Sequence, residues 1–186
     1  MHAPIFIVGY MGSGKSTVGR KMADVLGWRF IDTDFFIENR FRKRVADIFR
    51  DEGEAVVRRR ERVVIEELSG MEDAIIATGG GLPCHSDNMT LMNEAGLTLY
   101  LEVSDEVLVV RVVRCKTTRP KVKDKTGEEL LSHIREEMAF RGDIYRRAKV
   151  IVNSDKLVDE EDERQLVTRI VADLRAKGYL PQAIQP

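Results

Sequence analysis

Short apolar runs alternate along this chain with longer segments in which apolar residues recur every three or four positions. The short runs are typical of buried strands, and the longer spacing is typical of amphipathic helices. Strands that alternate with helices predict an α/β fold with a parallel sheet. The predicted strands cover residues 5–8, 28–32, 74–78, 97–103 and 149–152. The predicted helices cover residues 18–26, 35–69 with a break at Gly53, 87–94, 105–113, 128–140 and 159–174.

The first predicted strand leads into residues 9–17, which read G-x-x-x-x-G-K-S-T and precede a helix. Glycines let the backbone turn tightly and direct its N–H groups at phosphate oxygens, and the helix adds its positive N-terminal end. Lys15 can reach the β- and γ-phosphates, and the Ser16 hydroxyl can bind Mg²⁺. The alternative is a turn that only packs strand on helix, which the complete motif disfavours. The predicted nucleotide-binding residues are Gly12, Ser13, Gly14, Lys15, Ser16 and Thr17.

The second predicted strand ends in an acidic pair, Asp32 and Asp34. Two residues apart in an extended backbone, the two carboxylates lie on the same side. At the carboxyl end of a parallel strand they would face the ligand crevice. Asp32 could bind Mg²⁺ through water, and Asp34 could accept a proton from a substrate hydroxyl. The alternative is that one of them caps the helix that follows.

The segment 34–69 is strongly charged and is predicted to form a substrate-binding helical region. Within it, Arg58 and Glu61 stand three positions apart and can pair on one helical face. An arginine that points into the crevice would bind a carboxylate through two parallel hydrogen bonds. The neighbouring arginines at 59, 60 and 62 are expected to form a solvated charged face, although composition alone does not select Arg58.

A run of three glycines, Gly79, Gly80 and Gly81, follows the third predicted strand. Glycines at this place let a ligand approach the backbone closely and offer N–H donors. A flexible turn is the alternative, but Leu82 and Pro83 follow at once and stiffen the exit. The triple glycine is therefore predicted to contact substrate.

Residues 114–127 change character, because basic side chains crowd together there without apolar periodicity. We interpret this segment as a mobile lid that closes over the triphosphate and brings an arginine to the transferring phosphoryl group. A solvated loop is the alternative. A nucleic-acid patch is a third possibility, but no aromatic residues interleave with the charges to stack on bases.

The length of 186 residues fits one domain, and 30 basic against 31 acidic residues give a formal net charge of −1. This balance indicates neither a nucleic-acid nor a membrane partner. The two cysteines, Cys84 and Cys115, match no metal motif and no disulfide framework, which favours a reducing compartment. No apolar run approaches membrane-spanning length, and we see no room for a signal peptide, so a cytoplasmic location is expected.

Taken together, these motifs resemble the shikimate kinase family of small P-loop kinases, over roughly residues 5–154. The P-loop alone occurs in many families, whereas the later motifs are jointly much more specific. The motifs that carry the resemblance are G-x-x-x-x-G-K-S at 9–16, D-T-D at 32–34, G-E-x-x-x-R-x-x-E at 53–61, G-G-G at 79–81, Arg119-Pro120 in the basic segment, and Arg141 with Tyr145.

The resemblance implies a three-layer α/β/α sandwich in which a five-stranded parallel sheet has the strand order 2-3-1-4-5. It implies a single domain over 1–186 that uses ATP to convert shikimate to shikimate 3-phosphate in aromatic amino-acid biosynthesis. We expect a monomer. The implied catalytic residues are Lys15, Asp34 and Arg119. Ser16 and Asp32 would hold Mg²⁺, and Arg111 and Arg119 would join the P-loop in binding ATP. The implied shikimate-binding residues are Asp34, Arg58, Gly79, Gly80, Gly81 and Arg141.

Several positions depart from the family pattern. Val57 stands where phenylalanine is usual, Lys121 and Val122 replace two leucines of the lid, and Asp143 replaces a proline. The spacing from Arg111 to Arg119 is about one residue longer than in the family. Two alternatives therefore accompany the prediction, a P-loop kinase for another carboxylated polyol such as gluconate, and a nucleotide-binding module without turnover.

Overall fold

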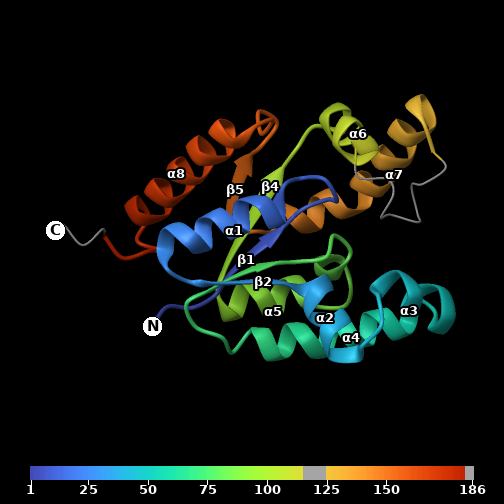
Figure 1. Cartoon of the computed structure of the whole chain (residues 1–186), viewed down its shortest axis with the longest axis horizontal. Helices are drawn as coiled ribbons and strands as arrows, with labels where there is room; N and C mark the ends of the chain where they lie inside the picture. Colours follow the sequence, from blue (N-terminus) through green and yellow to red (C-terminus); the bar gives the residue numbers. More distant parts are fainter. Residues whose placement is uncertain (115–124, 183–186) are drawn as a thin grey trace.

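The computed structural model describes residues 1–114 and 125–182. Five parallel strands form one sheet in the order β2-β3-β1-β4-β5 (Figure 1). This is the order that the family resemblance implies, so the predicted fold class is confirmed. The strands are β1 (Ile5–Val8), β2 (Arg29–Asp32), β3 (Ala74–Ala77), β4 (Leu97–Glu102) and β5 (Val150–Asn153).

Helices cover both faces of the sheet, which makes the molecule a three-layer sandwich (Figure 1). The helices are α1 (Lys15–Leu26), α2 (Thr33–Phe41), α3 (Val45–Glu52), α4 (Glu54–Leu68), α5 (Asn88–Ala95), α6 (Asp105–Arg114), α7 (Gly127–Tyr145) and α8 (Glu160–Ala176), with a short 3₁₀ turn η1 (Leu82–Cys84). Helices α1 and α8 pack on one face, and α4, α5 and α7 contribute to the core on the other.

The central strand β1 shows why the sequence reads as continuous apolar runs. Its side chains alternate between the two faces, so that Phe6 and Val8 enter one core while Ile5 and Ile7 enter the other. All four are essentially inaccessible to water, because both faces of the sheet are covered. Because β1 is the middle strand of the five, its carboxyl end, where the P-loop begins, lies at the centre of that edge of the sheet.

Helix α7 is longer than the sequence pattern predicts. It was expected to end near Phe140, but it continues to Tyr145 and so carries Arg141 on its last turns. A glycine inside a helix costs roughly 1 kcal/mol relative to alanine, yet Gly142 is buried within the helix. Tertiary contacts offset that cost, because Tyr145 is fully buried and its hydroxyl donates to the carbonyl of Gly80 at 2.6 Å. Neither α7 nor any other helix in the described ranges is long and apolar enough to cross a membrane.

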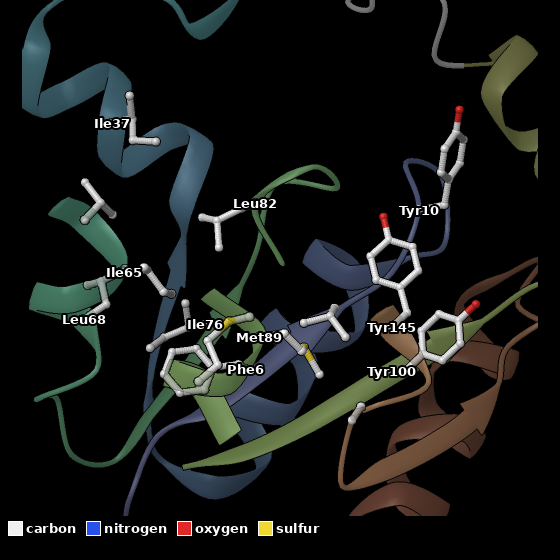
Figure 2. Close-up of a cluster of buried hydrophobic side chains, with 14 of the residues drawn as sticks. Phe6, Tyr10, Ile37, Ile65, Leu68, Ile76, Leu82, Met89, Tyr100 and Tyr145 are labelled. Atoms are coloured by element: carbon white, nitrogen blue, oxygen red, sulfur yellow. The ribbon is translucent and has the colours of Figure 1, made fainter. Parts of the chain in front are cut away.

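One of the two cores reaches the P-loop itself. Figure 2 shows the buried cluster that runs from Phe6 and Ile76 to three tyrosines, Tyr10, Tyr100 and Tyr145. The hydroxyl ends of Tyr10 and Tyr145 point away from the packed side chains (Figure 2). The core therefore fixes the loops at the carboxyl ends of the strands through side chains that have an apolar body and a polar tip.

Candidate active site

The P-loop connects β1 to α1 and adopts a conformation that needs glycine. Gly9, Gly12 and Gly14 have φ angles of 143°, 82° and 95°, which side chains rarely tolerate. A Cβ atom at Gly9 would also lie 2.9 Å from the carbonyl oxygen of Leu101 on β4. Because α1 begins at Lys15, its N–H groups and the positive end of its dipole face the loop. The loop is thus shaped to surround an anion.

Lys15 and Ser16 occupy the positions that phosphate and metal chemistry require. The ammonium of Lys15 is mostly buried and donates to the carbonyl oxygen of Tyr10 at 2.8 Å, so the side chain folds back over the loop. The hydroxyl of Ser16 donates to Oδ2 of Asp32 at 2.7 Å. The two oxygens proposed from the sequence to hold Mg²⁺ therefore meet at one point, at the end of β2.

Asp32 also caps α2, which was the alternative explanation for an acidic residue here. Its Oδ1 accepts hydrogen bonds from the backbone N–H groups of Asp34 at 3.1 Å and Phe35 at 3.4 Å. The two functions use different oxygens of the same carboxylate, so they do not compete. Capping holds Oδ2 toward Ser16, and it begins α2 so that Asp34 lies in the first turn.

The triple glycine lies between Asp34 and Arg58. A Cβ atom at Gly79 would collide with the carboxylate of Asp34, and one at Gly81 would lie 2.8 Å from Nη1 of Arg58. A Cβ atom at Gly80 would lie 3.5 Å from both the Gly9 carbonyl and the Met11 amide nitrogen, so this loop touches the P-loop. Only glycine lets a carboxylate, a guanidinium and the phosphate loop meet this closely around one backbone segment.

Arg58 extends from α4 and is held on both sides by carboxylates. Its Nη1 donates to Glu61 at 2.8 Å, while Nη2 and Nε donate to Glu54 at 2.6 Å and 3.1 Å. The expected pairing of Arg58 with Glu61 is therefore present. Burial raises the pKa of Glu61, although the charge of Arg58 opposes that rise and the charge of Asp34 adds to it. The hydrogen bonds to Glu54 and Glu61 fix the direction of the remaining N–H groups of Arg58.

The other arginines of this run were expected to be solvated, and only one of them is. Arg59 is exposed. Arg60 is half-buried, because it pairs with Glu52 at 2.7 Å and its guanidinium lies 4.6 Å from the ring centre of Phe41. Arg62 is also half-buried and pairs with Glu66 and Asp87. The expectation of a solvated face was wrong for these two, since α4 packs beside α2 and α5.

Arg141 reaches the same region from α7. Its Nη2 donates to Oε1 of Glu137 at 2.7 Å, and its guanidinium carbon lies 5.5 Å from the ring centre of Tyr10. Helices α4 and α7, which carry the two arginines, both pack against η1 directly after the triple glycine. Burial raises the pKa of the Cys84 thiol in this turn, and the charges of both Arg141 and Arg58 lower it. The two arginines thus come from helices that flank the same short segment.

This arrangement is matched by known proteins of one family. The sequence model of the shikimate kinase family matches residues 11–175. The chain belongs to the shikimate kinase family. The shikimate kinase of Parabacteroides distasonis is 45% identical over 158 residues, which is 85% of this chain and 91% of that protein. The predicted family is thus confirmed, and with it the enzyme class of an ATP:shikimate phosphotransferase.

Solved shikimate kinases share the whole fold. The crystal structure from Bacteroides thetaiotaomicron superimposes with a TM-score of 0.89 at 39% identity, covering 93% of this chain and 98% of that one. The structure from Acinetobacter baumannii, in complex with shikimate, superimposes with a TM-score of 0.84 at 30% identity over 95% of each chain. The three-layer P-loop fold is therefore that of shikimate kinases.

Arg111, which the family resemblance assigns to ATP binding, lies beside the P-loop on α6. A Cβ atom at Gly12 would lie 3.4 Å from the Cβ of Arg111. Nη2 of Arg111 donates to the carbonyls of Ser154, Asp155 and Leu157 at 2.7, 3.0 and 2.9 Å. Desolvation lowers the pKa of the Arg111 guanidinium. Arg111 thus ties the P-loop side of α6 to the loop between β5 and α8.

The remaining catalytic candidate, Arg119, lies outside the described residues, as does most of the proposed lid at 114–127. Of that segment, Arg114 ends α6 and is exposed, and Lys125 pairs with Glu129 at 2.8 Å. The lid therefore stays a prediction from the sequence.

Sequence reasoning missed Glu137 and the side chain of Tyr10, which both shape the site, and it gave no role to Glu54 although this residue belongs to the motif at 53–61. The two glutamates each stand four positions before a substrate arginine on a helix, a spacing that favours ion pairs and could have identified them. No comparable signal identifies the Tyr10 side chain, because the P-loop motif leaves that position open.

A hollow of about 690 Å³ on the described surface is not part of this site. It lies where β4 and β5 end, between α6 and α7. Its carboxylates outnumber its two basic groups, Arg135 and Arg146, so it is unsuited to a triphosphate. The acidic residues that line it are Glu102, Asp105, Glu106, Asp143 and Asp155.

Proposed function

We propose that this chain transfers the γ-phosphoryl group of ATP to shikimate at the junction of the P-loop and the triple glycine. One observation carries the proposal: Asp34, Arg58 and the triple glycine stand against the phosphate loop. Arg141 comes from α7, which the hydrogen bond from Tyr145 to Gly80 ties to the same triple glycine. A carboxylate, a phosphate cradle and two arginines are the groups that a carboxylated alcohol and ATP require.

The substrate carboxylate binds between Arg58 and Arg141. A guanidinium presents a planar fork that matches a carboxylate through two parallel hydrogen bonds. Arg58 uses one N–H on each of its three nitrogens for Glu54 and Glu61, which leaves second hydrogens on Nη1 and Nη2. The carboxylate partners hold each fork in place before substrate arrives, so little side-chain freedom is lost on binding.

Asp34 acts as the base. The substrate hydroxyl attacks the γ-phosphorus as its proton passes to the Asp34 carboxylate, and the bond from phosphorus to the β-phosphate oxygen breaks to release ADP. The contact between Asp34 and Gly79 supports this role, since it sets the carboxylate beside the loop that faces the P-loop. The backbone N–H groups of the P-loop, Lys15 and Arg119 stabilise the charge of the transferred group.

Ser16 and Asp32 are suited to hold Mg²⁺. Their oxygens meet at 2.7 Å, and Mg²⁺ in kinases binds one or two protein oxygens and completes its shell with phosphate and water. When bound, the ion neutralises charge on the β- and γ-phosphates.

An ADP-release assay of the wild-type chain, with and without shikimate, tests this function. We expect ADP release to depend on shikimate and on Mg²⁺, and we expect gluconate at the same concentration to give no comparable rate. Release driven by gluconate would favour the other polyol kinase, and ATP binding without ADP release would favour a nucleotide-binding module. The monomeric state and the cytoplasmic location stay predictions.

A further inference from the structure

The side chain of Tyr10 leaves the P-loop and joins it to α7. Tyr10 is only 1% exposed, and its hydroxyl donates to Oε2 of Glu137 at 2.7 Å. The phosphate chemistry described above uses the backbone of the P-loop and has no need of this hydroxyl. Burial and the Glu137 carboxylate both raise the pKa of Tyr10, so the hydroxyl stays protonated and remains a donor.

Glu137 also contacts Arg141. Its second oxygen, Oε1, accepts from Nη2 of Arg141 at 2.7 Å, and the guanidinium lies over the ring of Tyr10. Tyr10, Glu137 and Arg141 thus form a closed set of three contacts. The side chains of Glu137 and Arg141 are only 19% and 13% exposed, so these charge-assisted hydrogen bonds are largely shielded from water.

The backbone of Tyr10 is tied to the phosphate-binding group at the same time. Its carbonyl accepts from the ammonium of Lys15 at 2.8 Å and from the N–H of Ser13 at 3.2 Å. One residue therefore contacts the lysine of the P-loop through its carbonyl and the partner of Arg141 through its hydroxyl. One helical turn beyond Arg141, Tyr145 ties α7 to the triple glycine in the same manner, through Gly80.

We propose that Tyr10 and Glu137 are positioning residues that couple the P-loop to Arg141. Glu137 sets the direction of the guanidinium for the shikimate carboxylate, and Tyr10 holds Glu137 in register with the P-loop. The inference rests on the proposed role of Arg141 in binding shikimate. Because nucleotide orders the P-loop, its binding favours the position of Arg141 that shikimate needs, and shikimate favours nucleotide by the same factor.

The experiment compares Tyr10→Phe, Glu137→Ala, Glu137→Gln and the double variant Tyr10→Phe/Glu137→Ala with the wild type. Phenylalanine keeps the ring under Arg141 and removes only the hydroxyl. Tyr100→Phe is the matched control, because Tyr100 is as deeply buried in the same core but lies on β4, outside the contact set. The measurements are kcat, KM for each substrate, melting temperature, and calorimetric Kd for shikimate with and without MgADP.

For Tyr10→Phe we expect the shikimate Kd to rise about fivefold, the size of the net contribution of one typical hydrogen bond, with the KM for ATP changed less than about twofold. Glu137→Ala should raise the shikimate Kd about tenfold or more. Glu137→Gln should fall between the two, because the amide still accepts from Tyr10. The double variant should match Glu137→Ala alone, since Tyr10 acts through Glu137. The factor by which MgADP lowers the shikimate Kd should be smaller in all of these variants than in the wild type. Tyr100→Phe should match the wild type in every measurement.

The coupling proposal is wrong if Tyr10→Phe leaves shikimate affinity and the MgADP effect unchanged, if the two single effects add fully in the double variant, or if ATP and shikimate constants rise together. The role of Arg141 is judged separately with Arg141→Lys, and the function itself with wild-type turnover. A wild type that phosphorylates shikimate, with an Arg141→Lys variant that loses shikimate affinity and a Tyr10→Phe variant that does not, overturns this inference alone.

Discussion

The nucleotide side and the substrate side of this site are built in opposite ways. The nucleotide side is one continuous segment, 9–17, whose binding groups are backbone N–H groups and two consecutive side chains, Lys15 and Ser16. The substrate side is assembled from Asp34 on α2, the glycines after β3, Arg58 on α4 and Arg141 on α7. A local motif carries its own geometry, whereas an assembled site depends on how several elements pack.

The difference predicts two patterns of damage. Changes on the nucleotide side should affect the reaction with any acceptor, because they act on the transferred phosphoryl group. Changes to the arginines of the substrate side should be graded and should appear mainly in the constants for shikimate, because each contributes one contact among several. Asp34 is the exception on that side, since loss of the base should appear in kcat. The following variants test this contrast.

Lys15→Ala should have the largest effect. Without the ammonium, charge that develops on the transferred phosphoryl group loses a fixed positive partner, and we expect turnover to fall by roughly 10³-fold or more. The melting temperature should stay close to that of the wild type. Lys21→Ala, on the exposed side of the same helix and paired with Glu163, is the control. Turnover close to that of the wild type in Lys15→Ala would contradict the expected role of the nucleotide side in phosphoryl transfer.

Asp34→Asn should come next. Asparagine keeps the shape of the side chain but neither carries charge nor takes the proton of the substrate hydroxyl, so kcat should drop by roughly 10²- to 10⁴-fold. The affinity for ATP, measured by calorimetry, should change little. If ATP affinity falls while shikimate affinity is kept, Asp34 belongs to the nucleotide side instead.

Arg58→Lys should give a smaller and more selective loss. Lysine keeps the charge but lacks the planar fork, which removes an interaction on the order of 2–4 kcal/mol from a shielded site. The KM for shikimate should rise about 30-fold or more, with the KM for ATP nearly unchanged. Arg59→Lys is the matched control, because Arg59 is the exposed neighbour on the same helix. Equal shifts in both Michaelis constants would remove the selectivity that the contrast requires.

Glu61→Gln should have the smallest kinetic effect, about three- to fivefold on the shikimate KM, because glutamine still accepts one hydrogen bond from Arg58. It should also change the pH dependence of stability. Burial raises the pKa of Glu61 above its ordinary value of 4.5, so between these two values the folded protein binds a proton that the unfolded chain has released.

That proton makes stability fall as pH rises through the window above 4.5. The wild type should therefore lose unfolding free energy relative to Glu61→Gln over this range, which urea titrations at several pH values can measure. A constant difference between the two proteins would mean that Arg58 fully offsets the effect of burial.

Most of the fold was accessible from the sequence because the strands are buried on both faces and read as short apolar runs. The end of α7 could not be predicted from the sequence. The predicted helix stops at residue 140, two positions before Gly142, but the burial of Tyr145 and its hydrogen bond to Gly80 extend the helix. A propensity of about 1 kcal/mol is small beside a buried aromatic ring, which contributes roughly 1.5–3 kcal/mol.

The sequence alone identified some residues of the candidate site and left others undecided. Arg58 could be named only by resemblance, because four arginines stand within five consecutive positions, 58–62, and composition treats them alike. The structure separates them by their partners. Arg58 meets the triple glycine, Arg60 lies over Phe41, and Arg62 turns toward Asp87.

By itself, the sequence determined the phosphate loop, its lysine and serine, and the order of strands and helices, because each depends on residues that are neighbours along the chain. Only the tertiary structure decided that Tyr10 reaches Glu137, a partner 127 positions away, and that α4 and α7, which carry the two arginines, both pack against η1. Contacts of that kind depend on how α7 packs against the sheet. The free energy of that packing belongs to the whole core and to no single stretch of sequence.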